Sequence, residues 1–283
     1  MAVPRSPSPR LLGVDFTSAP GKRKPITVAT GRLRGGVLTL EDVEPLHDFI
    51  AFETLLNTPG PWLGAFDFPF GLPRVFVDSL GLGRDIGEVN EALHHRCESR
   101  MAFRALVDRW GNGRPAGQRL LHRRCDAAEP GVSSTSPLQT RYVPVGFMFF
   151  EGLSRLLSAG VTLPQMHAGD PARVALEGYP GLLAFELIGR RSYKNSDTPE
   201  RLAARAGIVR KLEAGHTRLT LQLCVTSAQR KLLLADPAGD WLDAVLCLVQ
   251  AAWASRRADY GLPLAVDPVE GWIVSAGWPC PFV

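Results

Sequence analysis

The chain has 283 residues, of which 45% are hydrophobic and 21% charged, with a formal net charge of +4. No apolar run is long enough to span a bilayer, so this ordinary balance predicts a soluble globular protein without a membrane partner. The five cysteines include no C-x-x-C pair, which argues against zinc and disulfide frameworks and favours reduced thiols in a cytoplasmic protein. The mild excess of positive charge permits nucleic-acid binding without requiring it.

The first nine residues carry charge and proline but no apolar stretch typical of a secretory signal. We expect a disordered arm over residues 1–9. Nothing further along marks a clean linker or an internal repeat. The sequence therefore predicts a single domain over residues 1–283, with a helical and loop insertion over residues 74–170.

Residues 11–17 (L-L-G-V-D-F-T) predict a buried first strand. Leu12, Val14 and Phe16 alternate onto one face, and Asp15 falls on the other. Aspartate is depleted in strand interiors, and a buried charge is costly unless something pairs with it. Asp15 is therefore a candidate functional residue.

The next segments predict strands over residues 26–33 and 37–40 around a Gly35-Gly36 turn, and then a helix over residues 41–56. A further apolar run, residues 61–70, again ends in an acid, Asp67, followed by proline-containing turns. A helix between two strands implies a crossover and parallel pairing. We therefore expect the strand that carries Asp67 to lie beside the first strand.

The remainder alternates helices with short strands and loops. The expected elements are mostly helix over 74–125, a loop over 126–144, a helix over 146–159, a strand over 173–176, a helix from 182, a basic loop over 189–197, helices over 199–213, 227–234 and 240–255, and a strand over 272–275.

Acidic residues follow or begin several of these elements. Adjacent strands lie about 4.8 Å apart, so the carboxylates of Asp15 and Asp67 would lie close together. Their like charges would repel, and a bound divalent cation would offset this repulsion. Asp240 and Asp243 lie three residues apart on one side of the late helix. Glu177 follows the strand over 173–176. Oxygen ligands of this kind suit Mg²⁺ or Mn²⁺, and two such ions can cleave a phosphodiester.

Several runs resemble domain-of-unknown-function family 429, whose members are predicted nucleases of the ribonuclease-H-like fold. The matching runs are G-V-D-F-T, D-F-P-F-G-L-P, E-G-Y-P, the Y-K after it and the D-x-x-D-A helix, between about residues 11 and 275. The resemblance implies an α/β fold with a mixed five-stranded sheet, three antiparallel strands followed by parallel ones, flanked by helices.

The resemblance also implies roles for the acids. Asp15 matches the first-strand catalytic acid and Asp67 the fourth-strand acid, while Asp240 and Asp243 look like the acidic pair of RuvC-type resolvases. Asp15, Asp67, Asp243 and Glu177 are the expected metal ligands. Local roles are the alternatives: turn bonds for the two strand aspartates, helix capping for Asp240 and Asp243, and an ion pair with an arginine for Glu177.

Basic residues near these acids are candidates for binding the phosphate backbone of a substrate. Lys194, Arg191 and Arg124 are the proposed contacts, and a solvated basic surface is the alternative for each. A homodimer would suit a resolvase-like enzyme, although nothing in the sequence shows one.

The leading hypothesis is thus a nuclease that hydrolyses DNA or RNA with two carboxylate-held metal ions. One alternative is a non-catalytic nucleic-acid or protein-binding module with a residual acidic site. Another is a phosphotransferase related to sugar kinases and actin-like ATPases. Phe16 stands where that class places a glycine, and the chain shows no duplication.

Overall fold

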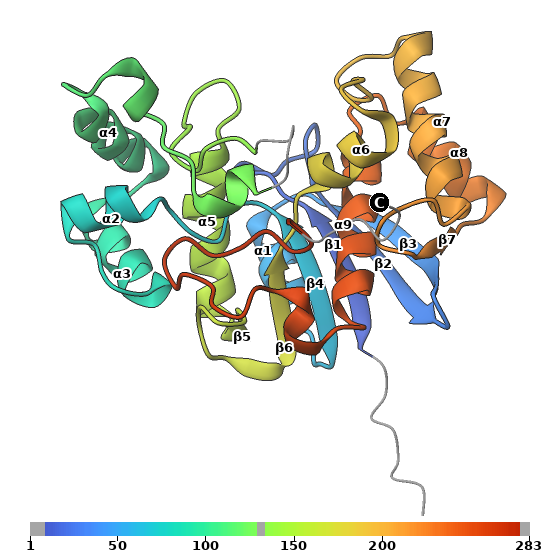
Figure 1. The fold of residues 1–283 in the computed structure, drawn as a ribbon, viewed down its shortest axis with the longest axis horizontal. Helices are drawn as coiled ribbons and strands as arrows, with labels where there is room; N and C mark the ends of the chain where they lie inside the picture. The colour runs from blue at the N-terminus through green and yellow to red at the C-terminus, as the bar shows by residue number, and fades with distance from the viewer. Residues whose placement is uncertain (1–8, 129–133, 278–283) are drawn as a thin grey trace, which may run out of the picture.

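The computed structural model describes residues 9–128 and 134–277 and is an α/β protein with a mixed seven-stranded sheet flanked by helices (Figure 1). The arm expected over residues 1–9 lies outside the described residues, apart from Pro9. Within the described ranges, no helix has both the length and the apolar character that crossing a membrane requires.

The sheet has the strand order β5-β6-β4-β1-β2-β3-β7. Its strands are β1 (Arg10–Asp15), β2 (Ile26–Arg34), β3 (Val37–Leu46), β4 (Trp62–Asp67), β5 (Val161–Thr162), β6 (Asp170–Glu177) and β7 (Gln222–Cys224). β1, β2 and β3 pair antiparallel, whereas β4 is parallel to both β1 and β6. The expected pairing of the first and fourth strands is therefore confirmed. The expected count of five strands is wrong, because the short strands β5 and β7 extend the two edges.

The helix expected over residues 41–56 is also wrong in its first part. β3 continues to Leu46 because it pairs with β2 as far as Ile26↔Leu46, across a register shift at Thr30/Gly31. The hydrogen bonds between β2 and β3 satisfy the backbone N–H and C=O groups of this segment, which in a helix would bond to one another. Helix α1 (Phe49–Leu56) begins only after Asp48, whose side chain caps it by accepting from the Ala51 amide at 2.8 Å.

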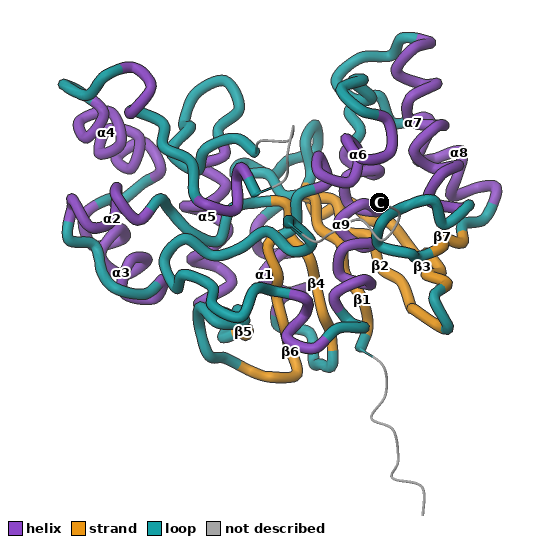
Figure 2. Tube along the Cα trace, in the orientation of Figure 1, coloured by secondary structure: helices purple, strands orange, loops and turns teal. Residues whose placement is uncertain are grey.

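The segment between β4 and β6 is mainly helical, as expected. It contains α2 (Arg74–Leu80), α3 (Ile86–Arg96), α4 (Arg100–Gly111), the short 3-10 turns η1 (Ala116–Gln118) and η2 (Arg124–Ala127), and α5 (Val145–Ser158). Later come α6 (Pro180–Ile188), α7 (Pro199–Glu213), α8 (Ser227–Ala235), α9 (Asp240–Ala254) and η3 (Ala258–Gly261). Figure 2 shows α2, α3 and α4 on the left and α7 and α8 on the right, with the sheet between them.

The strand expected over residues 272–275 is reduced to a single bridge, in which Ile273 pairs with Glu177. One face of the sheet packs on α9 together with α6 and α7, and the other packs on α1 and the insertion helices. Gly13 allows α9 to lie directly on β1, because a Cβ at this position would stand 2.1 Å from the Ala244 carbonyl oxygen. The buried helix therefore reaches the sheet at the strand that ends in Asp15.

Candidate metal centre

Asp15 and Asp67 end neighbouring parallel strands at the same level of the sheet. β1 and β4 are in register along their length, so that Gly13 lies opposite Ala65 and Asp15 opposite Asp67. Leu12 and Val14 belong to the core on the α1 side of the sheet, and Leu11 belongs to the core on the α9 side. Alternation along β1 therefore directs Asp15 to the α9 side, as the sequence pattern predicts.

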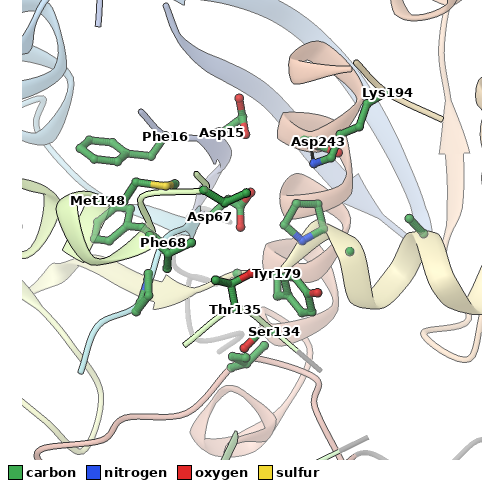
Figure 3. A pocket seen from close by; sticks show the side chains of 18 of the residues that line it. Asp15, Phe16, Asp67, Phe68, Ser134, Thr135, Met148, Tyr179, Lys194 and Asp243 are labelled. Atoms are coloured by element: carbon green, nitrogen blue, oxygen red, sulfur yellow. Dashed lines mark hydrogen bonds and ion pairs between the residues drawn. The ribbon is translucent and has the colours of Figure 1, made fainter. Parts of the chain in front are cut away.

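Asp243 completes a group of three carboxylates. It lies in the first turn of α9 and is only 1% exposed. One oxygen from each of Asp15, Asp67 and Asp243 lies within 4.8 Å of the other two (Figure 3). The close packing of α9 on Gly13 brings this turn to the strand ends. Three carboxylates at this separation are a group that could hold a metal ion.

The three carboxylates differ in their protein partners. The Tyr193 hydroxyl donates to Oδ1 of Asp243, and Lys194 Nζ donates to Oδ2 of Asp243 at 2.5 Å. No described residue donates a hydrogen bond or forms an ion pair to the carboxylate of Asp15 or Asp67, although Asp15 is only 7% exposed. Buried anions usually have a partner, so these two carboxylates retain the capacity to bind a cation.

The local electrostatics disfavour ionising these groups without a cation. Burial raises the pKa of Asp15 well above its ordinary value, and the nearby charges of Asp243 and Asp67 raise it further, while Lys194 opposes them. Burial likewise raises the pKa of Asp67 to about 7, against the opposing charge of Lys194. A bound divalent cation would reverse both effects by stabilising the ionised carboxylates.

The carboxylates lie in a cleft of about 1220 Å³ at the carboxyl ends of β1, β4 and β6. Figure 3 shows Phe16, Phe68 and Met148 on one side of Asp67 and the α9 residue Asp243 on the other. Polar and cationic side chains also line the cleft, among them Ser134, Thr135, Tyr179, Arg190, Arg191 and Lys194. The site is therefore open to a ligand much larger than a metal ion.

Asp240 lies near this group without joining it. It is the first residue of α9 and lines the cleft, but it lies outside the set of three. The alternative role of Asp240, as the N-cap of the helix, is wrong, because the N-cap is Gly239 in a left-handed conformation with φ 85°. The backbone amide of Trp241, in the first turn of α9, donates to the side chain of Asp236 and not to Asp240. Burial raises the pKa of Asp240, opposed by the charge of Lys24.

Glu177 has a different environment from the three aspartates. Arg123 donates to both of its oxygens, at 2.5 and 2.8 Å, and the Phe70 amide donates at 2.9 Å. Asp126 and Ser134 continue this buried network on the other side of Arg123. The arginine ion pair that the sequence leaves open for Glu177 is thus present, and Glu177 lies outside the group of three. The network ties η2 to the end of β6.

The three basic residues singled out from the sequence have separate positions. Lys194 contacts Asp243, and Arg191 lines the cleft while its Nε donates to the Ile188 carbonyl at 2.9 Å. Arg124 is exposed and does not line the cleft, whereas its neighbour Arg123 does. Tyr193, which contacts Asp243, appears in the sequence analysis only as part of the Y-K run and is given no role there. The signal for it in the sequence is its place in that run, directly before Lys194 in the basic loop.

Comparisons of the chain with protein-family models, curated proteins and solved structures found no match. The structure itself shows an α/β protein with a buried group of three carboxylates that could hold a metal ion.

Proposed function

We propose that the chain is a divalent-metal-dependent nuclease of the ribonuclease-H-like class, related to domain-of-unknown-function family 429, which hydrolyses phosphodiester bonds in DNA or RNA. The observation that carries the proposal is the convergence of Asp15, Asp67 and Asp243 in the lining of a cleft of about 1220 Å³. Neighbouring parallel strand ends and one helix turn supply these residues.

The strand arrangement supports the assignment to this class. The sub-order β3-β2-β1-β4-β6, with three antiparallel strands followed by parallel ones, is the arrangement that the resemblance implies. β5 and β7 add to its two edges. In such sheets, ligands bind beyond the carboxyl ends of the parallel strands, which is where the cleft lies.

The donor set fits Mg²⁺ or Mn²⁺. Both are hard cations that prefer carboxylate oxygens and keep open positions for water and substrate. Asp15 and Asp67 would hold the ion through oxygens that lack protein partners, and Asp243 would complete its protein ligands. When bound, the ion would polarise a phosphate oxygen and lower the pKa of a coordinated water.

The residues around the acids suit a phosphate-containing substrate. Arg190 and Arg191 line the cleft in the loop after α6 and would neutralise backbone phosphates. The apolar side chains of Phe68 and Met148 line the side nearest Asp67 and would keep bulk water from it. Binding through phosphate charges predicts weaker affinity at higher salt.

A panel of single-stranded, duplex and branched DNA and RNA, assayed with Mn²⁺ and with EDTA, tests the proposal. We expect Mn²⁺-dependent cleavage by the wild type, and loss of at least 10²-fold in rate in Asp15→Asn and Asp67→Asn. Asp42→Asn changes an exposed strand aspartate that does not line the cleft and serves as the matched control, for which we expect wild-type activity.

Cleavage that survives EDTA, or that persists in both active-site variants, would contradict the proposal. Binding of the same substrates without any cleavage would instead support the alternative of a nucleic-acid-binding module with a residual acidic site.

A further inference from the structure

We propose that Lys194 supplies the second cation of this site, so that the group of Asp15, Asp67 and Asp243 holds one divalent metal ion and not the two that the sequence suggests. The inference rests on the proposed metal-dependent function. It assigns the ammonium group to the position on Asp243 that a second metal ion would otherwise occupy.

The hydrogen bonds distinguish Asp243 from the two strand aspartates. Both oxygens of Asp243 already accept from protein donors, one from the Tyr193 hydroxyl and the other from Lys194 Nζ. Asp15 and Asp67 have no such donors among the described residues. In the view of Figure 3, Asp243 lies between the two strand aspartates and Lys194. A metal ion therefore has free ligands on the strand side, and the helix side carries a cation of the chain itself.

The structure fixes the backbone that carries Lys194. Gly239, at the start of α9, is in a left-handed conformation, and a Cβ there would lie 2.6 Å from the Cβ of Lys194. On the other side, the buried guanidinium of Arg205 donates to the Tyr193 carbonyl at 3.0 Å. The basic loop is thus held between α9 and α7, which gives Lys194 a defined place against Asp243.

The charges support a single metal ion. One ammonium and one divalent ion balance three ionised carboxylates. A second divalent ion beside Lys194 would leave an excess of positive charge, even with the nearby carboxylate of Asp240 included. Lys24 also faces this group from the cleft lining, and Arg123 is already neutralised by Glu177 and Asp126. Like charges at this separation repel strongly in a partly buried site.

This arrangement gives Lys194 two roles toward the proposed reaction. It orients Asp243 by holding one of its oxygens, and it presents a permanent positive charge to the cleft that a phosphate group would enter. In enzymes with two ions, the second metal supplies that charge and lies about 3.5–4 Å from the first.

Titration with Mn²⁺, followed by calorimetry and electron paramagnetic resonance, tests the inference on the full chain. We expect one Mn²⁺ per chain in the wild type, with the spectrum of an isolated ion. Lys194→Met keeps the apolar stem and removes the charge, so we expect two Mn²⁺ per chain with spin coupling between them. Two controls should each bind one Mn²⁺ per chain. Lys194→Arg keeps the positive charge at this position, and Lys24→Met removes a different positive charge from the same cleft.

Two coupled ions in the wild type would overturn the inference, and so would a Lys194→Met variant that binds one ion with unchanged affinity. A far-UV circular dichroism spectrum of each variant confirms that it is folded. Failure of the proposed function gives a different result: one bound Mn²⁺ in the wild type with no cleavage of any nucleic acid would refute the nuclease and leave the assignment of Lys194 intact. No bound Mn²⁺ in any variant would refute both.

Discussion

Replacing Asp67 with asparagine is expected to stabilise the metal-free protein at neutral and alkaline pH. Asp67 is half-buried at the end of β4, and no described residue donates to its carboxylate. Burial raises its pKa to about 7, despite the opposing charge of Lys194. Asparagine keeps nearly the same shape and cannot ionise. The variant therefore avoids the free-energy cost that the wild type meets when Asp67 loses its proton.

The magnitude follows from the difference between the folded and unfolded pKa values. The pKa of Asp67 is raised from its ordinary value of 3.8 to about 7 in the folded protein. The contribution of this group to the free energy of unfolding is therefore fully present below pH 3.8 and is lost as the pH rises through about 7. At about 1.4 kcal/mol per pKa unit, the free energy of unfolding of the wild type should fall relative to that of Asp67→Asn by at most about 4 kcal/mol.

Urea unfolding in EDTA between pH 4 and 8.5 measures this difference, with the slope of each transition checked for constancy. The two proteins should have similar free energies of unfolding at pH 4 and diverge as the pH rises. The control Asp42→Asn, at an exposed carboxylate, should show no comparable divergence. A wild type that is as stable as Asp67→Asn at pH 8, or more stable, would refute the electrostatic reasoning.

Two further predictions concern the framework of the site. Arg123→Met leaves Glu177 buried without its partner and should lower the free energy of unfolding by about 3–5 kcal/mol, whereas Arg124→Met at the exposed neighbour should change it by less than about 0.5 kcal/mol in the same urea assay. Gly13→Ala places a Cβ 2.1 Å from the α9 backbone and should cost at least about 1–3 kcal/mol, while Gly21→Ala, where a Cβ meets nothing within 4 Å, should be nearly neutral. Equal effects within either pair would contradict the contacts described.

The sequence predicts the two strand acids of the site well, because each lies at the end of an apolar run and the helix between the runs implies parallel pairing. Asp15 and Asp67 are indeed opposite one another on β1 and β4. Asp243 follows from helical periodicity, which places it near the start of α9. Local patterns suffice here because strand alternation and helix spacing determine which side each residue faces.

Contacts between distant segments account for what the sequence does not predict. The apolar spacing of Val43, Leu46 and Phe49 suits a helix, but pairing with β2 makes the first two of these residues part of a strand. Glu177 meets Arg123 only because η2 folds back on the end of β6. A pattern read along the chain records neither the sheet register nor such a partner.

Thermal unfolding with and without millimolar Mn²⁺ measures whether Asp15, Asp67 and Asp243 bind a metal ion in the folded protein. Binding to the native state raises the unfolding midpoint, and a concentration of 100 times Kd contributes about 2.7 kcal/mol. We expect this midpoint to increase with Mn²⁺ in the wild type and in Asp42→Asn, and not in Asp15→Asn. No increase in the wild type, or an equal increase in Asp15→Asn, would contradict this expectation.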